Sequence, residues 1–486
     1  MLNIVCVPLT LILLWGGGLL INKAPLSPQH IIYLLVILTL WLLLFSLNVS
    51  NWNNNISLLH VLLSCVILVA IKTKTLLLFY IFFELRIIPI TLIVFFYGYQ
   101  PEKLQASLYL LLYTMVCRLP LLFYIIIEKG MIIRSLLRIP MTLGFIVKRP
   151  IFILHAWLPK AHVEAPVGGS MVLAGVLLKL GTYGLILLLP LIKINALLIF
   201  YFRISLIGSS VGALICLRQG DLKLLIAYSS VVHIGVVSLG LLSGTELGYT
   251  CGVMIVLRHG IVSPLLFAFA YWLYSSSHSR LMLNNAGTIP LMIAGIMGLV
   301  SLNIGTPPRV GLWSEVLITV STISLITWSI PFLMLMFLLG LSYNLHLYSA
   351  CIHVKFSHQH QSTQMHWFWP VLQAISLGYA SFLCLDIFII YVFKTYLIPP
   401  PVNTNKQKKS NNINKMSISS TSLEAEMMIL YEVSVVMTSS YSRNEKGSQN
   451  DMETVKTGRN VKYTAVNRIT DAKFSVYILD TLQWSK

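Results

Sequence analysis

Six ionisable side chains lie inside long apolar runs, or at breaks in them, where a charge is costly. They are Glu84, Lys148, Lys179, His233, His259 and Glu315. A charged side chain at the centre of a bilayer costs at least about 2.5–3.5 kcal/mol on insertion scales, so the set implies partners or internal water. Carboxyl, amine and imidazole groups can also exchange protons with hydrated neighbours. The set therefore indicates a proton path, with buried structural polar groups as the alternative.

Lys179 is the clearest member of the set. It lies in the run VGGSMVLAGVLLKLGTYGLILLL, far from any other charge in the sequence. Burial disfavours the ammonium form, so such a lysine can release its proton to a neighbour. The alternative is a lysine that snorkels to the membrane surface. Long apolar segments on both sides keep the headgroups out of easy reach, which favours a function in proton transfer.

Glu84 needs a partner that its own helix does not supply. Arg86 is only two residues away, but residues two apart face different sides of a helix. We therefore expect Lys148, on another helix, to pair with Glu84. Glu315 follows a Pro-Pro break and is also expected to carry protons.

The histidines are weaker candidates when each is taken alone. A single buried histidine is more often a structural hydrogen-bonding group than a transport group. His233 and His259 both lie near the middle of apolar runs, and together with the lysines and glutamates they favour transport. His155 is a secondary candidate, because a continuous helix would place it two turns after Lys148 on the same face.

The composition is that of a membrane protein. Of the 486 residues, 57% are hydrophobic and only 10% are charged, against roughly 25% charged residues in soluble domains. The net charge of +18 comes from basic residues spread singly between apolar runs. That spacing favours attraction to anionic lipid over nucleic-acid binding.

Apolar runs long enough to cross the bilayer, about 20 residues each, fill the sequence to about residue 396. We expect an all-α, polytopic transmembrane helix bundle of about 14 helices, near 4–21, 31–49, 56–71, 75–98, 104–127, 141–158, 167–192, 195–217, 222–243, 248–274, 284–304, 308–328, 329–350 and 368–396. Prolines and glycines interrupt this pattern at 148–166 and 303–315. Two interruptions of this kind suggest broken helices related by an inverted repeat.

Four regions follow from this pattern. We expect N-terminal transmembrane helices over 1–74, an antiporter-like core over 75–350, a C-terminal transmembrane helix over 351–398, and a polar, disordered tail over 399–486. Residues 401–486 hold 20 of the 50 charges in the chain, which predicts the tail. The first 20 residues have no basic leader and are predicted to form a membrane helix rather than a signal peptide.

Sequence signals for cofactors are missing. The sequence has no GxGxxG fingerprint after a strand, no P-loop, no CxxC pair and no plausible iron–sulfur ligand set. The seven cysteines mostly lie in apolar runs and are interpreted as packing residues. We therefore expect neither a cofactor nor a metal site in this chain.

Four sequence runs resemble the chain-4 family of mitochondrial NADH:ubiquinone oxidoreductase (respiratory complex I), whose members are antiporter-like proton-translocating subunits. The resemblance is strong over residues 75–350. The runs are FELRIIPITLIVFFYGYQPEKLQASLYLLLYT (83–114), HAWLPKAHVEAPVGGSMVLAGVLLKLGTYG (155–184), RQGDLKLLIAYSSVVHIG (218–235) and PPRVGLWSE (307–315).

The resemblance implies a fold with two inverted five-helix repeats containing broken helices. It implies a Glu84–Lys148 pair, a central Lys179, a path through His233 and His259, and an exit acid at Glu315. It also implies a multi-pass protein of the mitochondrial inner membrane that pumps protons while other subunits carry NADH, FMN, Fe–S clusters and ubiquinone. The implied partners are the other complex I membrane subunits, including neighbouring antiporter-like subunits, and lipid.

Two alternatives to the implied function stay open. The first is a cation/proton antiporter subunit of the same superfamily, which would not co-purify with NADH-oxidising subunits. The second is a structural membrane scaffold that transports nothing.

Four arginines depart from the pattern of the resembling family, which usually has serine or another small residue there. They are Arg86, Arg118, Arg258 and Arg309. We hypothesise that some of these codons are AGA or AGG triplets that the organelle translates as serine. Mass spectrometry of the natural protein is expected to find serine at some of the four positions, because four arginines in the membrane would be costly. Arginine at all four positions would contradict the hypothesis.

Overall fold

The computed structural model describes residues 28–49, 54–73, 75–98, 100–127, 144–189, 196–277, 279–282, 290–306 and 310–352. These residues form helices and no strand, apart from an isolated β-bridge between Asp221 and Leu281. The spans expected at 4–21 and 368–396 lie outside the described residues, as does the expected tail from 399. The all-α membrane fold is confirmed for the described part of the chain.

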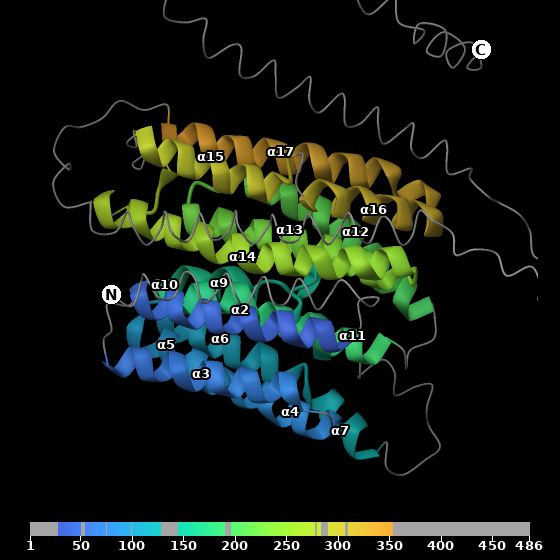
Figure 1. Cartoon of the computed structure of the whole chain (residues 1–486), viewed down its shortest axis with the longest axis horizontal. Coiled ribbons are helices and arrows are strands. Elements are labelled where there is room, and N and C mark those ends of the chain that lie inside the picture. The colour runs from blue at the N-terminus through green and yellow to red at the C-terminus, as the bar shows by residue number, and fades with distance from the viewer. Residues whose placement is uncertain are drawn as a thin grey trace, which may run out of the picture. The chain divides into compact units, whose positions relative to one another are not determined.

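Figure 1 shows the described helices in the order in which they follow along the chain. The N-terminal half contains α2 (Pro28–Val49), α3 (Asn54–Lys72), α4 (Leu76–Leu85), α5 (Ile87–Tyr97), α6 (Lys103–Val116), α7 (Leu119–Ile127), α9 (Trp157–Glu164), α10 (Val167–Val172) and α11 (Leu178–Leu188). The C-terminal half contains α12 (Ala196–Leu217), α13 (Leu222–Leu242), α14 (Glu246–Ser277), α15 (Pro290–Ile304), α16 (Val310–Leu325) and α17 (Ile330–Ile352).

Eight helical segments in this part of the chain are long and apolar enough to cross a membrane. Some consist of two consecutive helices, as where α4 and α5 together form the span Leu76–Tyr97. Within such a span the backbone N–H and C=O groups bond to each other, which is the arrangement that hydrocarbon demands.

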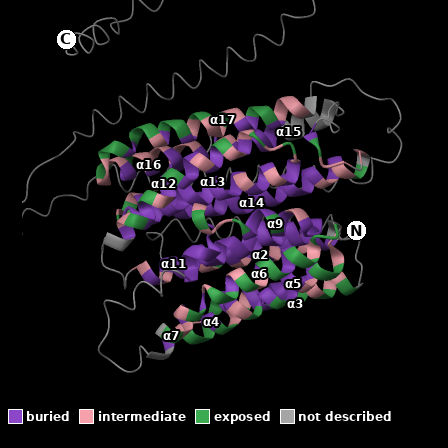
Figure 2. Ribbon diagram, turned by 180° about the vertical axis from the view of Figure 1, so that it is seen from behind, coloured by how far each residue is buried: buried purple, intermediate pink, exposed green. Residues whose placement is uncertain are grey.

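Helix α14 is the centre of the described bundle. It packs against α13 and α16 on one side and against α2 and α10 on the other (Figure 1). The apolar, membrane-spanning segment of α14 is wholly buried, whereas only 28% of the corresponding segment of α17 is buried. The outward faces of α3, α6 and α17 expose large apolar side chains such as Leu338 (Figure 2). Such a surface suits lipid or another membrane protein rather than water.

The helix expected over 141–158 is not continuous, so that prediction was wrong. A short helical stretch at 144–148 ends in a turn at Arg149–Pro150, and a 3₁₀ turn at Phe152–Leu154 precedes α9. Proline lacks a backbone N–H and disfavours helical geometry in the residue before it, so the helix stops before Pro150. Pro166 separates α9 from α10 in the same way.

The second expected break is present between α15 and α16. Gly305 has φ +80°, and the backbone N–H groups of Gly305 and Thr306 both donate to the Ser301 carbonyl, at 3.0 and 3.1 Å. This left-handed glycine cap ends α15 inside the bundle.

A π-helical turn at Leu173–Leu177 joins α10 to α11 within the span Val167–Leu188. Gly175 in this turn lies against Gly260 of α14. A methyl group added to Gly175 would meet Pro264 Cγ at 2.9 Å and the Gly260 carbonyl oxygen at 3.3 Å. Small residues allow this close backbone approach between membrane helices.

We therefore expect Gly175→Ala to destabilise the protein by about 1–3 kcal/mol, because the proline ring and the carbonyl cannot move aside freely. The matched control is Gly340→Ala on α17, where no atom lies within 4 Å of the added methyl group. Thermal loss of folded protein in detergent, followed by size-exclusion chromatography, measures the difference. Equal melting of the two variants would contradict the packing role of Gly175.

Candidate functional site

Lys179 lies on α11 with only 3% of its surface exposed. Its Nζ donates to the carbonyl oxygen of Ala174 at 2.5 Å and lies 2.7 Å from Nδ1 of His259. Ala174 belongs to the π-helical turn, so the irregular part of the helix supplies one of the two partners. Both partners are neutral dipoles, and a proton can pass between an amine and an imidazole nitrogen at this distance.

His259 leads from Lys179 to His233. The two imidazole rings are 5.5 Å apart between centroids and tilted by 53°. His259 comes from α14 and His233 from α13, and both side chains are buried. Three of the residues that the sequence predicted therefore form a line of titratable groups across α11, α14 and α13.

Two asparagines lie near the end of this line, and sequence reasoning missed them. Asn303, in the last turn of α15, lies near His233. Asn303 Nδ2 donates to Asn344 Oδ1 on α17 at 2.8 Å, and Asn344 Nδ2 donates to the Gly340 carbonyl at 2.8 Å. The sequence signal for them is a single amide side chain in each of two apolar helices. An unsatisfied polar group would be costly there, so each amide needs a partner.

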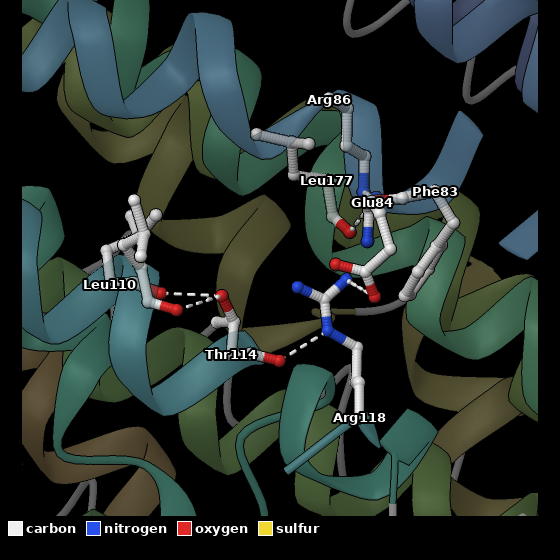
Figure 3. Close-up of polar contacts among 8 residues, drawn as sticks. Phe83, Glu84, Arg86, Leu110, Thr114, Arg118 and Leu177 are labelled. Carbon is white, nitrogen blue, oxygen red and sulfur yellow. Dashed lines mark hydrogen bonds and ion pairs between the residues drawn. The ribbon is translucent and has the colours of Figure 1, made fainter. Parts of the chain in front are cut away.

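Glu84 is paired with Arg118 and not with Lys148 (Figure 3). Arg118 Nη1 lies 2.7 Å from Glu84 Oε1, and Arg118 Nε donates to the Thr114 carbonyl at 2.5 Å. Helix α7, which follows Arg118, packs against α4 and brings the guanidinium to the carboxylate. The Nζ of Lys148 lies 5.6 Å from the ring centroid of Trp157, and Lys148 acts on Glu84 only electrostatically. The predicted direct pair was therefore wrong.

Arg86 donates to backbone carbonyls and not to Glu84, in line with its expected role as a poor local partner. Its Nε donates to the Phe83 carbonyl at 2.9 Å and its Nη1 to the Leu177 carbonyl at 3.0 Å (Figure 3). The guanidinium carbon also lies 3.8 Å from the centroid of the Phe83 ring.

Glu315 lies on α16 just after the second break and forms an ion pair with Arg258 of α14. Arg258 is held next to Gly305 and Gly311, which flank the break. The C-terminal end of α15 carries a partial negative charge that favours a cation at this place.

His155 does not share a helix face with Lys148, because the break at Pro150 lies between them. Its ring stacks on Phe152, with centroids 4.7 Å apart, and meets the edge of Tyr228 at 5.9 Å. The expectation that placed His155 beside Lys148 was wrong.

Three of the four unusual arginines lie in the described part of the chain, and all three are buried. Nη2 of Arg86, Nη2 of Arg118 and Nη1 of Arg258 have no hydrogen-bond partner there. A buried polar group left unsatisfied costs about 1–3 kcal/mol. Buried serines avoid this cost by donating to their own helix, as Ser263 does to the His259 carbonyl at 2.8 Å. Arg149, which is not one of the four, is also buried with Nε, Nη1 and Nη2 unpartnered in the described part of the chain, so this cost does not single out the four positions. The serine hypothesis stays a prediction; Arg309 lies outside the described residues.

The arrangement defines a class of protein. A membrane helix bundle with interrupted helices and a buried line of lysine and histidine is typical of an ion-translocating membrane protein. Among the residues that the structure describes, no group of three or more His, Cys, Asp or Glu side chains could hold a metal ion.

The sequence model of the family described as "NADH:quinone oxidoreductase/Mrp antiporter, TM" matches residues 73–342. The chain belongs to this family. It is 39% identical to NADH-ubiquinone oxidoreductase chain 4 of Ceratitis capitata over 351 residues, which cover 66% of this chain and 78% of that protein. It is 36% identical to the protein of the same name from Albinaria caerulea, with the same coverage.

Two solved structures share the fold. One is a chain of respiratory complex I from Thermus thermophilus, at 19% identity and a TM-score of 0.62, covering 80% of this chain and 99% of that one. The other is a chain of the Mrp complex from Dietzia sp., at 14% identity and a TM-score of 0.64, covering 80% of this chain and 90% of that one.

Proposed function

We propose that this chain is a core membrane subunit of respiratory complex I that translocates protons across the mitochondrial inner membrane. Electron transfer from NADH to ubiquinone takes place in other subunits, which hold the FMN and Fe–S clusters. The observation that carries the proposal is the buried amine of Lys179, which lies 2.7 Å from an imidazole nitrogen and bonds to no acid among the described residues. The names of the curated relatives support the assignment to complex I.

In the proposed route, Lys179 holds the proton at the centre of the bundle. The proton passes from Nζ to Nδ1 of His259, leaves this ring for His233, and moves on toward Glu315. Arg258, which directly precedes His259 on α14, forms the ion pair with Glu315 and also acts electrostatically on both histidines. Water in the bundle would complete the steps that the side chains do not bridge.

The driving signal is electrostatic. Glu84, Lys148 and Arg118 form a charged group on the N-terminal side of the bundle, and a change in their pairing would alter the proton affinity of Lys179. Moving one charge against 100 mV costs about 2.3 kcal/mol. A hundredfold change in proton affinity corresponds to about 2.7 kcal/mol. A hundredfold change in the proton affinity of Lys179 would therefore be large enough to drive transfer.

The test is Lys179→Ala in the assembled complex. We expect ubiquinone-linked NADH oxidation and proton pumping per complex to fall on the order of tenfold or more, because a positioned proton-transfer group contributes at least that much. NADH oxidation by an artificial acceptor that draws electrons upstream of ubiquinone measures the amount of complex. Lys72→Ala, at the exposed end of α3, is the matched control and is expected to pump normally.

The same experiment separates the alternatives. A structural scaffold predicts that Lys179→Ala reduces the amount of complex but leaves pumping per complex intact. A cation/proton antiporter subunit predicts that the chain purifies without NADH-oxidising subunits. Either result would overturn the proposed function.

A further inference from the structure

We propose that Lys160 of α9 and Tyr109 of α6 form a binding site for an anionic phospholipid on the outer face of the bundle. The ammonium group of Lys160 holds the lipid phosphate, and exposed leucines of α6 contact the acyl chains. Neither residue belongs to the line of Lys179, His259 and His233, so this inference does not rest on the proposed function.

The contact between Lys160 and Tyr109 joins two helices. Lys160 Nζ lies 4.0 Å from the centroid of the Tyr109 ring, and helices α6 and α9 pack against each other. The face of an aromatic ring attracts a cation at this distance. Both side chains are exposed, Tyr109 to 37%. The ring therefore holds the ammonium group at the surface of the bundle.

The ammonium group of Lys160 has no acidic partner among the described residues. Two ion pairs are present there, and neither involves Lys160. Glu164 lies one turn further along α9, but it is buried and forms no ion pair with this lysine. A phosphate group can accept the N–H donors of an ammonium group and neutralise its charge. The exposed amine therefore lacks the counter-ion that a lipid phosphate supplies.

The surface next to this amine is apolar. Leu104, Leu108 and Leu112 of α6 are each more than half exposed, on the outward face of the helix (Figure 2). They are spaced four residues apart, so they form one stripe along α6. Tyr109 directly follows Leu108 and lies beside this stripe. Acyl chains are as apolar as leucine, so the stripe can contact them.

The contact lies near one end of the bundle. Tyr109 is six residues after the start of α6 at Lys103, about 9 Å along the helix axis. Lys160 is four residues before the end of α9 at Glu164, about 6 Å. These two ends meet, because a methyl group added to Gly98 would contact both Lys103 Cβ and the Glu164 carbonyl oxygen. Lysine and tyrosine at this depth can reach the headgroup layer with their polar ends.

A phospholipid fits both parts of this surface. Its phosphate matches the amine of Lys160, and its chains match the leucine stripe. A soluble anion would leave the stripe uncovered, and an apolar helix would leave the ammonium group without a counter-ion. The net charge of +18 further favours anionic over zwitterionic lipid.

The experiment uses the protein purified in its native assembly and placed in nanodiscs that contain a photoactivatable phosphatidylglycerol. Irradiation attaches the lipid to nearby residues, and mass spectrometry of the peptides measures the labelling of α6 and α9. A photoactivatable diacylglycerol, which has the same chains but no phosphate, is the matched probe. We expect phosphatidylglycerol to label the leucine stripe about tenfold more than diacylglycerol, because only its phosphate bonds to the charged amine.

Four variants identify the groups that bind. Lys160→Gln removes the charge and is expected to lower phosphatidylglycerol labelling about tenfold, to the level of diacylglycerol. Lys160→Arg keeps a cation and is expected to restore the labelling. Tyr109→Leu removes the ring and is expected to lower labelling about threefold. Lys72→Gln, at the exposed end of α3, is the matched control and is expected to leave labelling unchanged.

The labelling is normalised to the recovered amount of unlabelled α6 peptide, so a variant that assembles poorly still gives a result. Equal labelling of the stripe by the two probes would show only apolar contact with lipid and would overturn the site. Wild-type labelling of Lys160→Gln would also overturn it, because the amine would then not hold the phosphate. If neither probe labels the stripe, another protein subunit covers this face, and the proposal fails.

Discussion

The arrangement of the buried polar residues depends on how the primary amine of Lys179 is accommodated deep inside an apolar bundle. In the part of the chain that the structure describes, Lys179 has a backbone carbonyl and an imidazole as its hydrogen-bonding partners, and neither carries a full charge in its neutral form. A carboxylate in contact would hold the ammonium in a tight ion pair and resist release of its proton. Dipolar partners satisfy the N–H groups without fixing the charge. The π-helical turn and His259 of α14 contact this amine, and His233 of α13 lies next to His259.

The two acids of the site, unlike Lys179, have oppositely charged partners. Glu84 and Glu315 are each held by an arginine, Arg118 and Arg258, and both of these arginines have unsatisfied N–H groups. A serine at positions 118 and 258 would release both carboxylates to titrate. The identity of these two residues therefore decides whether the ends of the proposed route are permanent ion pairs or exchangeable acids.

Much of the architecture could be predicted from the sequence, because apolar runs and proline breaks act locally. Lys179, His233 and His259 could be identified because each is a single titratable residue in an apolar run. The partner of Glu84 could not, since it depends on how α7 packs against α4. The same applies to Asn303 and Asn344, which are neutral and gain meaning only from their contact across helices. His155 and Lys148 were misplaced because periodicity assumed a continuous helix through Pro150.

The glycine contact between the π-helical turn and α14 has a consequence for how the centre of the bundle can move. Gly175 directly follows Ala174, and Gly260 directly follows His259, so a close backbone crossing lies beside the two partners of the Lys179 amine. Helices in contact at this crossing cannot slide or tilt far without a clash. The distance between donor and acceptor is thus set by rigid main chain, and a 1 Å error there would slow transfer by about a hundredfold. In the proposed route, the proton passes between Lys179 and His259 at this crossing while the two helices stay still.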